Sequence, residues 1–321
     1  MSEQMSLTEL LPMEKSEILF LYETSYSTPN GDPFTGEQRY DEETKKILVS
    51  DVRIKRFIRD EMERLGYNIY VSNPDPENKL NAGQRFMQLF GERKDKNQSA
   101  REFALSLIDV RLFGAVIPIQ KEKGKKKNEG GESLDAGEKE NAFNITGAIQ
   151  FSVLNPSLNS VDLRMHQNTS TFVSKEGNKQ GAIGTTTVVP YALNQIHGWI
   201  NPYSAKHTGL TEADVTQMFQ ALWSSINNAN TRTKQNQNSL LLLQIVYSEP
   251  TKKLYGADRL IKLNASKATE EQIRSSEDYT LDFGKLHDAA QNEIVKEIRF
   301  FTEVQAIAEK LQGEKFKAII L

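Results

Sequence analysis

Residues 240–247 read LLLLQIVY, an almost entirely apolar run of strand length. Such a run is typical of a strand buried on both faces, which requires a central place in a sheet whose two faces are covered. A similar run, EILFLY, occupies residues 17–22 and is followed by Pro29, Gly31 and Pro33, which break regular structure. Two strands of this kind predict a sheet with a large buried core.

Residues 49–65 carry the spacing of an amphipathic helix. Ser50 stands where an N-cap is expected, and Gly66 follows the end of the pattern. Weaker helical patterns surround residues 82–90 and 99–108. The apolar residues that share one side of the first helix are Ile54, Phe57, Ile58, Met62 and Leu65.

Residues 211–230 form the clearest helical pattern in the chain, with apolar residues at i, i+3, i+4 and i+7. Thr211 and Asp214 have the spacing of a capping box in which Asp replaces Glu. The spacing of apolar residues also predicts a last helix over residues 288–310.

Short strands are expected at residues 67–71, 148–153 and 188–191. The elements then follow the order strand, helix, strand, large insertion, strand, second insertion, helix, strand. This is the β-α-β-β-α-β order of a ferredoxin-like domain, which is also the layout of an RNA-recognition module. The sequence therefore predicts an α+β fold with two additions in its loops.

Two segments depart in composition from the rest. Residues 118–141 contain a lysine run followed by an acidic, glycine-rich run, which predicts a mobile surface loop. Residues 155–187 are polar throughout, and they fit equally a disordered loop or a hairpin that reaches over a single nucleic-acid strand. The basic and apolar residues of this segment are Arg164, Met165, His166, Phe172, Lys175 and Lys179.

Several kinds of chemistry find no support in the sequence. The chain has no cysteine, which excludes disulfides and thiolate chemistry and fits a cytoplasmic protein. Neither an HExxH zinc pair, a G-x-S-x-G elbow nor a phosphate-binding P-loop occurs, so we expect no cofactor and no metal. No apolar run approaches the roughly 20 residues of a membrane span, so no membrane association is expected. The net charge of −3 means that a nucleic-acid site has to be a local basic patch.

The basic residues of the first helix allow two interpretations. Lys55, Arg56 and Arg59 lie off its apolar stripe, and Lys55 and Arg59 repel each other at i, i+4 unless an anion or a carboxylate is near. A solvated surface of mixed charge, with Asp60 and Glu63 as partners, is the simpler interpretation, and phosphate contact is the alternative.

Six stretches together resemble the backbone subunit of type I CRISPR Cascade complexes, the Cas-seven family, and most closely its Csh-two branch of subtype I-B. The resemblance extends over about residues 17–263. The stretches are TSYSTPNGDP (24–33), LVSDVRIKRFIRD (48–60), DVRLFGA (109–115), TGAIQFS (146–152), VVPYALNQIHGWINP (188–202) and TGLTEADV (208–215).

The resemblance implies a domain plan shaped like a right hand. An RNA-recognition-like palm would comprise residues 14–71, 142–154 and 188–263. A helical fingers insertion would span residues 72–141, and a β-hairpin thumb residues 155–187. The remaining residues, 264–321, are expected to form a C-terminal helical extension.

The resemblance also implies which residues contact an RNA guide. Positions after the first strand and at the start of the first helix would contact phosphate and ribose, and thumb residues would displace a base. Replacing Lys55 and Arg59 by Glu is expected to remove guide binding and leave the fold intact. The candidate residues are Asn30, Arg39, Ser50, Lys55, Arg56, Arg59, Arg164, Met165, His166 and Phe172.

The implied function is that of a non-catalytic scaffold that oligomerises along a CRISPR RNA guide and presents it for pairing with target DNA. The implied partners are further copies of the chain, a large subunit, a guide-handle-binding subunit and a guide-processing endonuclease. One alternative is a metal-dependent ribonuclease that uses Asp32 or Asp41. Another is a generic single-strand RNA-binding protein.

Overall fold

The structure is a computed structural model of the chain, and it describes residues 11–72, 75, 77–118, 142–173 and 181–321. Within these residues the largest sheet has seven strands in the order β14-β13-β10-β1-β9-β6, and β8 pairs with β9 outside this row. Its strands are β1 (Ser16–Ser27), β6 (Ile149–Phe151), β8 (Arg164–Val173), β9 (Gly181–Ile200), β10 (Gln237–Tyr247), β13 (Val295–Phe301) and β14 (Phe316–Ala318).

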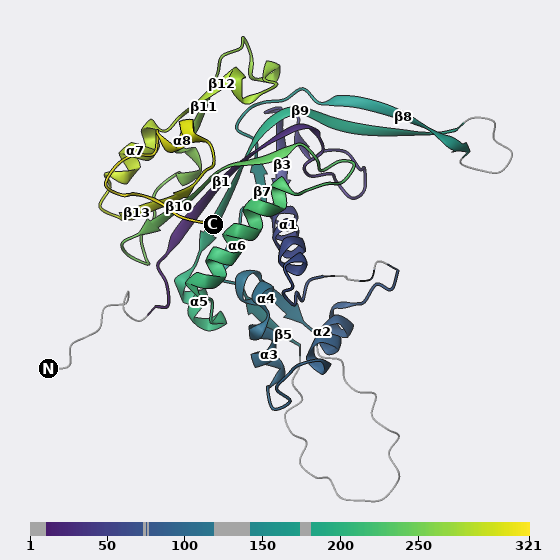
Figure 1. Ribbon diagram of the computed structural model, residues 1–321, viewed down its shortest axis with the longest axis vertical. Coiled ribbons are helices and arrows are strands. Elements are labelled where there is room, and N and C mark those ends of the chain that lie inside the picture. Colours follow the sequence, from purple (N-terminus) through teal and green to yellow (C-terminus); the bar gives the residue numbers. More distant parts are fainter. Residues whose placement is uncertain (1–10, 73–74, 76, 119–141, 174–180) are drawn as a thin grey trace, which may run out of the picture.

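Helices α1 (Asp51–Arg64) and α6 (Glu212–Asn227) lie side by side over one face of the sheet (Figure 1). Alternate residues of β1, including Phe20, point into the core between the sheet and these helices. The Phe20 ring meets the edge of Trp223 from α6 at a centroid distance of 6.2 Å. Both helices begin where the sequence predicts, with Ser50 and Thr211 as their N-caps.

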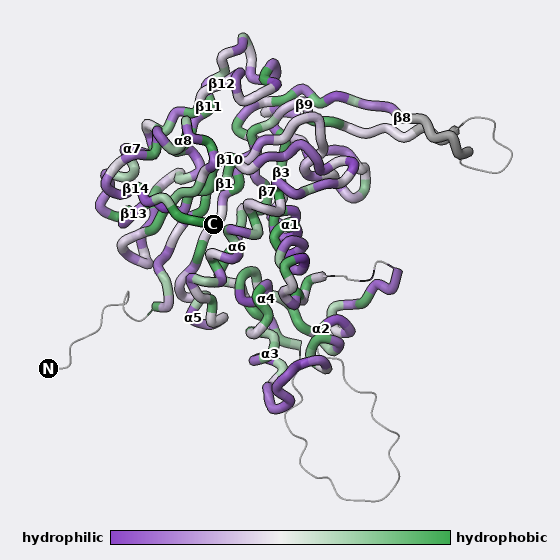
Figure 2. Tube along the Cα trace, viewed as in Figure 1, coloured by the Kyte–Doolittle hydropathy of each residue, from purple (hydrophilic) through white to green (hydrophobic). Residues whose placement is uncertain are grey.

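The C-terminal part of the chain covers the opposite face of the sheet with a second core, which contains Leu19 and Leu21 of β1. Hydrophobic residues are concentrated along β1 and β10 (Figure 2), which are covered on both faces. The covering elements are η1 (Ala257–Arg259), β11 (Lys262–Ala265), η2 (Glu270–Gln272), η3 (Ser276–Asp278), β12 (Tyr279–Asp282), α7 (Gly284–Ala290) and α8 (Gln305–Ala308).

The prediction of a helix over residues 288–310, and with it of a helical C-terminal extension, is wrong. The middle of this segment is β13, Val295–Phe301, which pairs with β10 so that Ile298 lies beside Ile245. Without β13 the apolar strand β10 would be an exposed edge, and pairing removes that edge. Val295 and Ile298 both pack into the second core, and the half-buried Phe301 meets Trp223 on the helix side. A register shift opposite Val246 and Tyr247 puts Val295 and Ile298, three residues apart, on the same side, and this spacing hides the period of two that identifies a strand.

Four strands of the central sheet and the two helices on its face follow the order strand, helix, strand, strand, helix, strand along the chain. They are β1, α1, β6, β9, α6 and β10. The prediction of a strand at residues 67–71 is wrong, because this segment has no regular secondary structure. The carboxylate of Asp109 accepts hydrogen bonds from the backbone N–H groups of Tyr70 and Val71, both at 3.0 Å, in place of a neighbouring strand. The position of the second strand is taken by β6, and β9 is far longer than the predicted strand.

The insertion between α1 and β6 has a small core of its own, built around the rings of Phe86, Phe90 and Phe103. Its β4 and β5 pair so that Ile117 lies opposite Phe143. The segment predicted as a mobile loop, residues 118–141, lies almost wholly outside the described residues. The elements are α2 (Ala82–Gly91), α3 (Ala100–Ser106), α4 (Ile108–Phe113), β4 (Gly114–Ile117) and β5 (Phe143–Thr146).

A hairpin of β8 and the first half of β9 projects away from the body of the protein (Figure 1). Arg164 pairs with Val188 at its base, and Thr169 pairs with Ile183 farther out. A second sheet with the order β2-β3-β7 lies near this base. Its strands are β2 (Tyr40–Asp41), β3 (Lys46–Ser50) and β7 (Leu154–Pro156), and the remaining helix is α5 (Pro202–Thr208). None of the helices in the described part of the chain has the length and apolar character needed to cross a membrane.

Candidate nucleic-acid interface

The loop after β1 is joined to the start of α1 by Asn30 and Ser50. The side chain of Asn30 accepts a hydrogen bond from the Ser50 backbone N–H at 2.7 Å. The Ser50 hydroxyl accepts one from the Arg53 backbone N–H at 3.4 Å, as an N-cap does. Both residues are buried. The structure therefore brings these two predicted site residues together, and each side chain has a partner within the protein.

The same loop contains Arg39 and the two carboxylates of the alternative, metal-dependent interpretation. Arg39 forms an ion pair with Asp32 at 3.1 Å. The Phe34 backbone N–H bonds Asp32 at 2.9 Å and, with further help from Thr35 and Arg39, lowers its pKa despite some desolvation. A hydrogen bond from the Thr44 side chain similarly lowers the pKa of Asp41. Each carboxylate thus stabilises a turn, and the described residues contain no cluster of three metal-binding side chains.

The three predicted cations of α1 all have carboxylate partners. Lys55 bonds Asp51 at 3.1 Å and the Gln150 side chain at 3.0 Å. The half-exposed Arg56 pairs with Asp60 at 2.5 Å. These carboxylates neutralise the positive charges locally. A position off the apolar stripe of the helix therefore does not show that a cation is available to bind an anion.

Arg59 departs most from the prediction, because it is buried and does not lie on a solvated surface. Its Nε donates to the carboxylate of Asp109 at 3.1 Å, and its guanidinium lies 5.1 Å from the centre of the Phe113 ring. Burial lowers the pKa of Arg59, and the charge of Asp109 opposes this effect. Arg59 therefore joins α1 to the insertion, so replacing Lys55 and Arg59 by Glu would place a buried carboxylate at position 59 against Asp109 and disturb the fold.

Arg53 is a cation that the sequence interpretation missed. Its guanidinium lies over the Phe57 ring at 3.7 Å, and its buried Nε has no hydrogen-bond partner. Within the described residues it forms no ion pair, and Asp60, whose charge acts on it, is paired with Arg56. Arg53 borders the apolar stripe beside Phe57, which is why the pattern did not separate it from core residues.

Lys234 lies next to Arg53, although the two are far apart in sequence. Its Nζ donates to the backbone oxygen of Thr28 at 2.7 Å and to the Thr233 hydroxyl at 3.3 Å. Burial, and then the positive charge of Arg53, lower the pKa of Lys234 to about 8. Both cations line a cavity of about 220 Å³, whose other charged lining residues, Asp60, Glu61 and Arg64, all take part in ion pairs. Two neighbouring cations without an ion-pair partner in the described structure favour the binding of an anion between them.

Tyr26, at the end of β1, has an exposed ring in a strained backbone. Its φ is 46°, in the left-handed region that bulky residues rarely adopt, and 61% of its surface is exposed. Backbone hydrogen bonds from Ser25 to Asn236 at 3.0 Å and from Thr28 to Thr233 at 2.8 Å hold it there. Exposed aromatic rings are the groups on which bases of single-stranded nucleic acids stack.

The hairpin carries the other predicted residues. Arg164, Met165 and His166 are all exposed near its base, Met165 to 74%. Phe172 lies in β8, but its side chain is outside the described part of the structure.

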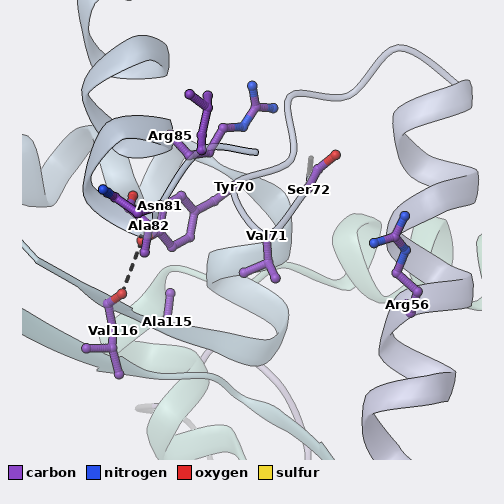
Figure 3. A pocket seen from close by; sticks show the side chains of 10 residues that line it. Arg56, Tyr70, Val71, Ser72, Asn81, Ala82, Arg85, Ala115 and Val116 are labelled. Carbon is purple, nitrogen blue, oxygen red and sulfur yellow. Dashed lines mark hydrogen bonds between the residues drawn. The ribbon is translucent and has the colours of Figure 1, made fainter. Parts of the chain in front are cut away.

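A cavity of about 370 Å³ separates α1 from the insertion. Figure 3 shows Arg56 on the α1 side, and Tyr70, Val71 and Val116 on the other. The Tyr70 hydroxyl donates to the backbone oxygen of Val116 at 3.1 Å and is thereby fixed. The α1 side of the cavity carries Arg56, and the insertion side carries Arg85 and Asn81 together with apolar residues.

A family model and a curated relative both point to one family. A family model described as CRISPR-associated protein Cas7 matches residues 14–284. A protein of Haloferax volcanii named CRISPR-associated protein Cas7 is 28% identical over 284 residues, which are 85% of this chain and 82% of that protein. A chain of a solved CRISPR RNA-guided surveillance complex matches with a TM-score of 0.48 and 12% identity, covering 91% of this chain and 90% of its own. A second, from a pre-nicking complex of that kind, has a TM-score of 0.46 and 11% identity, covering 95% and 96%.

Proposed function

Because this chain belongs to the CRISPR-associated protein Cas7 family, whose model matches it over most of its length, we propose that it is a guide-binding backbone subunit of a Cascade-type complex. The match to residues 14–284 is the observation that carries the proposal, and it confirms the family predicted from the sequence. Assignment to the Csh-two branch of subtype I-B, and a cytoplasmic location, are parts of the proposal.

In this proposal the body formed by β1, α1, β6, β9, α6 and β10 is a ferredoxin-like palm. Residues 72–141 are the fingers, and the β8–β9 hairpin within residues 155–187 is the thumb. The guide backbone passes the start of α1, where Arg53 and Lys234 lie side by side without an ion-pair partner in the described structure. Phosphate contacts of this type fix position and carry no sequence information, so guide sequence is read by pairing with target DNA.

The thumb of one copy reaches over the guide bound to the next copy and contacts it through Arg164, Met165, His166 and Phe172. Arg39 and the half-exposed Arg56 lie along the same path and contact the guide by exchanging their carboxylate partners, Asp32 and Asp60, for phosphate. Asn30 and Ser50 act through the backbone, because they fix the loop against the first turn of α1. Lys55 and Arg59 hold α1 in place beneath the path. Lys55 bonds Gln150, and Arg59 pairs with Asp109.

Repeated contact along the guide holds it in an extended form before target DNA arrives. Target pairing then costs less ordering free energy than pairing to a free RNA would. The other proposed partners are the large subunit, the guide-handle-binding subunit and the guide-processing endonuclease. The scaffold is proposed to be non-catalytic, since Asp32 and Asp41 are both engaged in their own turns.

The proposal is tested by co-expressing the chain with its operon neighbours and sequencing the RNA that co-purifies. The double variant Arg53→Gln, Lys234→Gln is expected to lose most of this RNA, because two phosphate contacts are removed. The matched control is Lys206→Gln, Lys317→Gln, which neutralises two exposed lysines elsewhere on the surface. RNA retention that is equal in both double variants contradicts the proposed path.

The two alternative functions give different results in the same preparation. A metal-dependent ribonuclease cuts complementary RNA at regular intervals with Mg²⁺, and this cutting disappears in Asp32→Ala or Asp41→Ala. A generic single-strand binder carries unrelated cellular RNA in place of CRISPR guides. We expect intact complementary RNA and a guide-derived sequence pool.

A further inference from the structure

A second cationic hollow lies on the face of the sheet opposite to α1. Along β9, Ile196 points into the core beneath α1, so its neighbours Gln195 and His197 point to the other face. There they line a cavity of about 410 Å³ with residues of β3, β7 and α7 and of the segment around η1. We call this cavity the far-face pocket, and its charged lining residues are Lys46, His197, Asp258, Arg259, Lys262 and Lys285.

The far-face pocket is strongly and locally positive. It has four permanently charged cations, Lys46, Arg259, Lys262 and Lys285, against the single carboxylate of Asp258. In the part of the chain that the structure describes, none of the four forms an ion pair with a carboxylate, whereas Lys55, Arg56 and Arg59 of α1 all do. In a chain whose net charge is −3, such a local cluster of unpaired positive charges attracts a polyanion.

The floor of the far-face pocket contains a polar group that lacks a partner. The Gln195 side chain is 8% exposed, and its Nε2 donates to the backbone oxygen of Asp258 at 2.6 Å. Its buried Oε1 has no hydrogen-bond partner. A buried acceptor needs a donor, which a ribose hydroxyl or a base N–H supplies and a fully ionised phosphate does not. Cations together with this acceptor therefore fit a nucleotide better than a free phosphate.

An aromatic side chain stands beside the cations. Tyr255 is 93% exposed, and the Arg259 guanidinium lies 5.2 Å from the centre of its ring. Gly256, with φ of 71°, allows this approach, because a Cβ there would come within 2.6 Å of the Arg259 side chain. A positive groove with an exposed aromatic ring is the combination on which successive bases stack in single-strand binding proteins.

We propose that the far-face pocket binds a single strand of nucleic acid that is distinct from the guide. The four cations contact its phosphates, Tyr255 stacks on a base, and Gln195 accepts a hydrogen bond from a sugar or base. That this strand is not the guide rests on the proposed function, which places the guide on the α1 side of the sheet. In an assembled filament the pockets of successive copies would form a second track parallel to the guide.

The test uses the purified, guide-loaded complex and two fluorescent probes of equal length, oligo(dT) and oligo(U), neither complementary to the guide. Lys262→Glu with Lys285→Glu is expected to weaken probe binding at least about tenfold, and Tyr255→Ala by about fivefold or more. The matched controls are Lys206→Glu with Lys317→Glu, which makes the same charge change on other surfaces, and Tyr203→Ala, which removes another exposed ring. Both controls are expected to bind as the unmodified complex does.

Comparison of the two probes tells whether the strand is DNA or RNA.

Equal weakening of probe binding in the pocket variants and the charge-matched control shows general electrostatics and overturns the proposal. Loss of guide RNA from Lys262→Glu, Lys285→Glu also overturns it, because the pocket would then belong to the guide path. Full competition by inorganic phosphate overturns the nucleotide assignment. A complex that carries no guide while its pocket still binds probe refutes the proposed function and leaves single-strand binding by the pocket supported.

Discussion

At the scale of single residues, the partner of a cation decides its role more than its place on a helix does. Arg53, Lys55, Arg56 and Arg59 lie within two turns of α1, yet the last three have carboxylate partners and only Arg53 forms no ion pair in the described residues. The partners come from distant segments or from the same helix. Helical spacing reveals partners on the same helix and gives no information on partners from distant segments.

The Arg59–Asp109 pair predicts a large effect on stability. Asp109 is fully buried and accepts hydrogen bonds from two backbone N–H groups as well as from Arg59. Asp109→Ala leaves a buried charge without a partner, and we expect the free energy of unfolding to fall by about 3–5 kcal/mol. Arg56→Ala, which breaks a half-exposed pair, should cost about 1 kcal/mol or less. Urea denaturation measures both, and similar losses would contradict the structural role of Asp109.

The lowered pKa of Lys234 predicts that guide binding depends on pH. The free side chain loses its proton as the pH rises through about 8, because burial and Arg53 disfavour its charged form. A bound phosphate favours the charged form and raises this pKa, so binding takes up a proton. Affinity should therefore fall by up to about tenfold between about pH 7 and pH 9. Filter binding of labelled guide to the guide-free chain measures it. Lys234→Arg, which stays charged, should remove most of this pH dependence, and an unchanged profile would exclude Lys234 as its source.

At the scale of elements, the sequence predicted α1 and α6 well because their apolar stripes and caps are local signals. It failed at residues 67–71 and 288–310, where the outcome depends on distant groups: the carboxylate of Asp109 and the open edge of β10. The candidate site divides in the same way. Asn30 and Ser50 were found together, whereas Lys234 was missed because it reaches Arg53 only through the tertiary fold.

The capping box of α6 makes a prediction about that element. Thr211 and Asp214 bond each other's backbone N–H groups, and Asp214 also pairs with Arg111 of α4 at 2.6 Å. Thr211→Ala should therefore lower the free energy of unfolding by about 1 kcal/mol, the usual cost of a lost N-cap. Asp214→Ala should cost clearly more, because it also leaves Arg111 without its partner. Thermal unfolding monitored by circular dichroism compares them, and equal shifts would show that the Arg111 pair contributes nothing.

At the scale of the whole molecule, the chain combines a body with two covered sheet faces and a hairpin that projects beyond it. Under the proposed function, a body that binds one stretch of guide and a hairpin that reaches the next copy would give a head-to-tail contact, which builds an open filament when its rotation does not close. The length of such an assembly is set by the RNA, because each copy is held by its own stretch of guide.

This dependence on the guide predicts discrete masses. If the guide is shortened stepwise, native mass spectrometry should show the complex losing whole copies of this chain, in steps of 36.4 kDa plus the RNA removed. Shortening the guide by less than one copy's stretch should remove RNA mass alone, since the last copy keeps part of its contact. A hairpin variant gives a second check: Met165→Glu should weaken the contact of the hairpin with the guide on the next copy without reducing the stability of the isolated chain, because Met165 is mostly exposed. Masses that vary continuously with RNA length, or a fixed number of copies on every guide, would contradict the proposal that the guide sets the length.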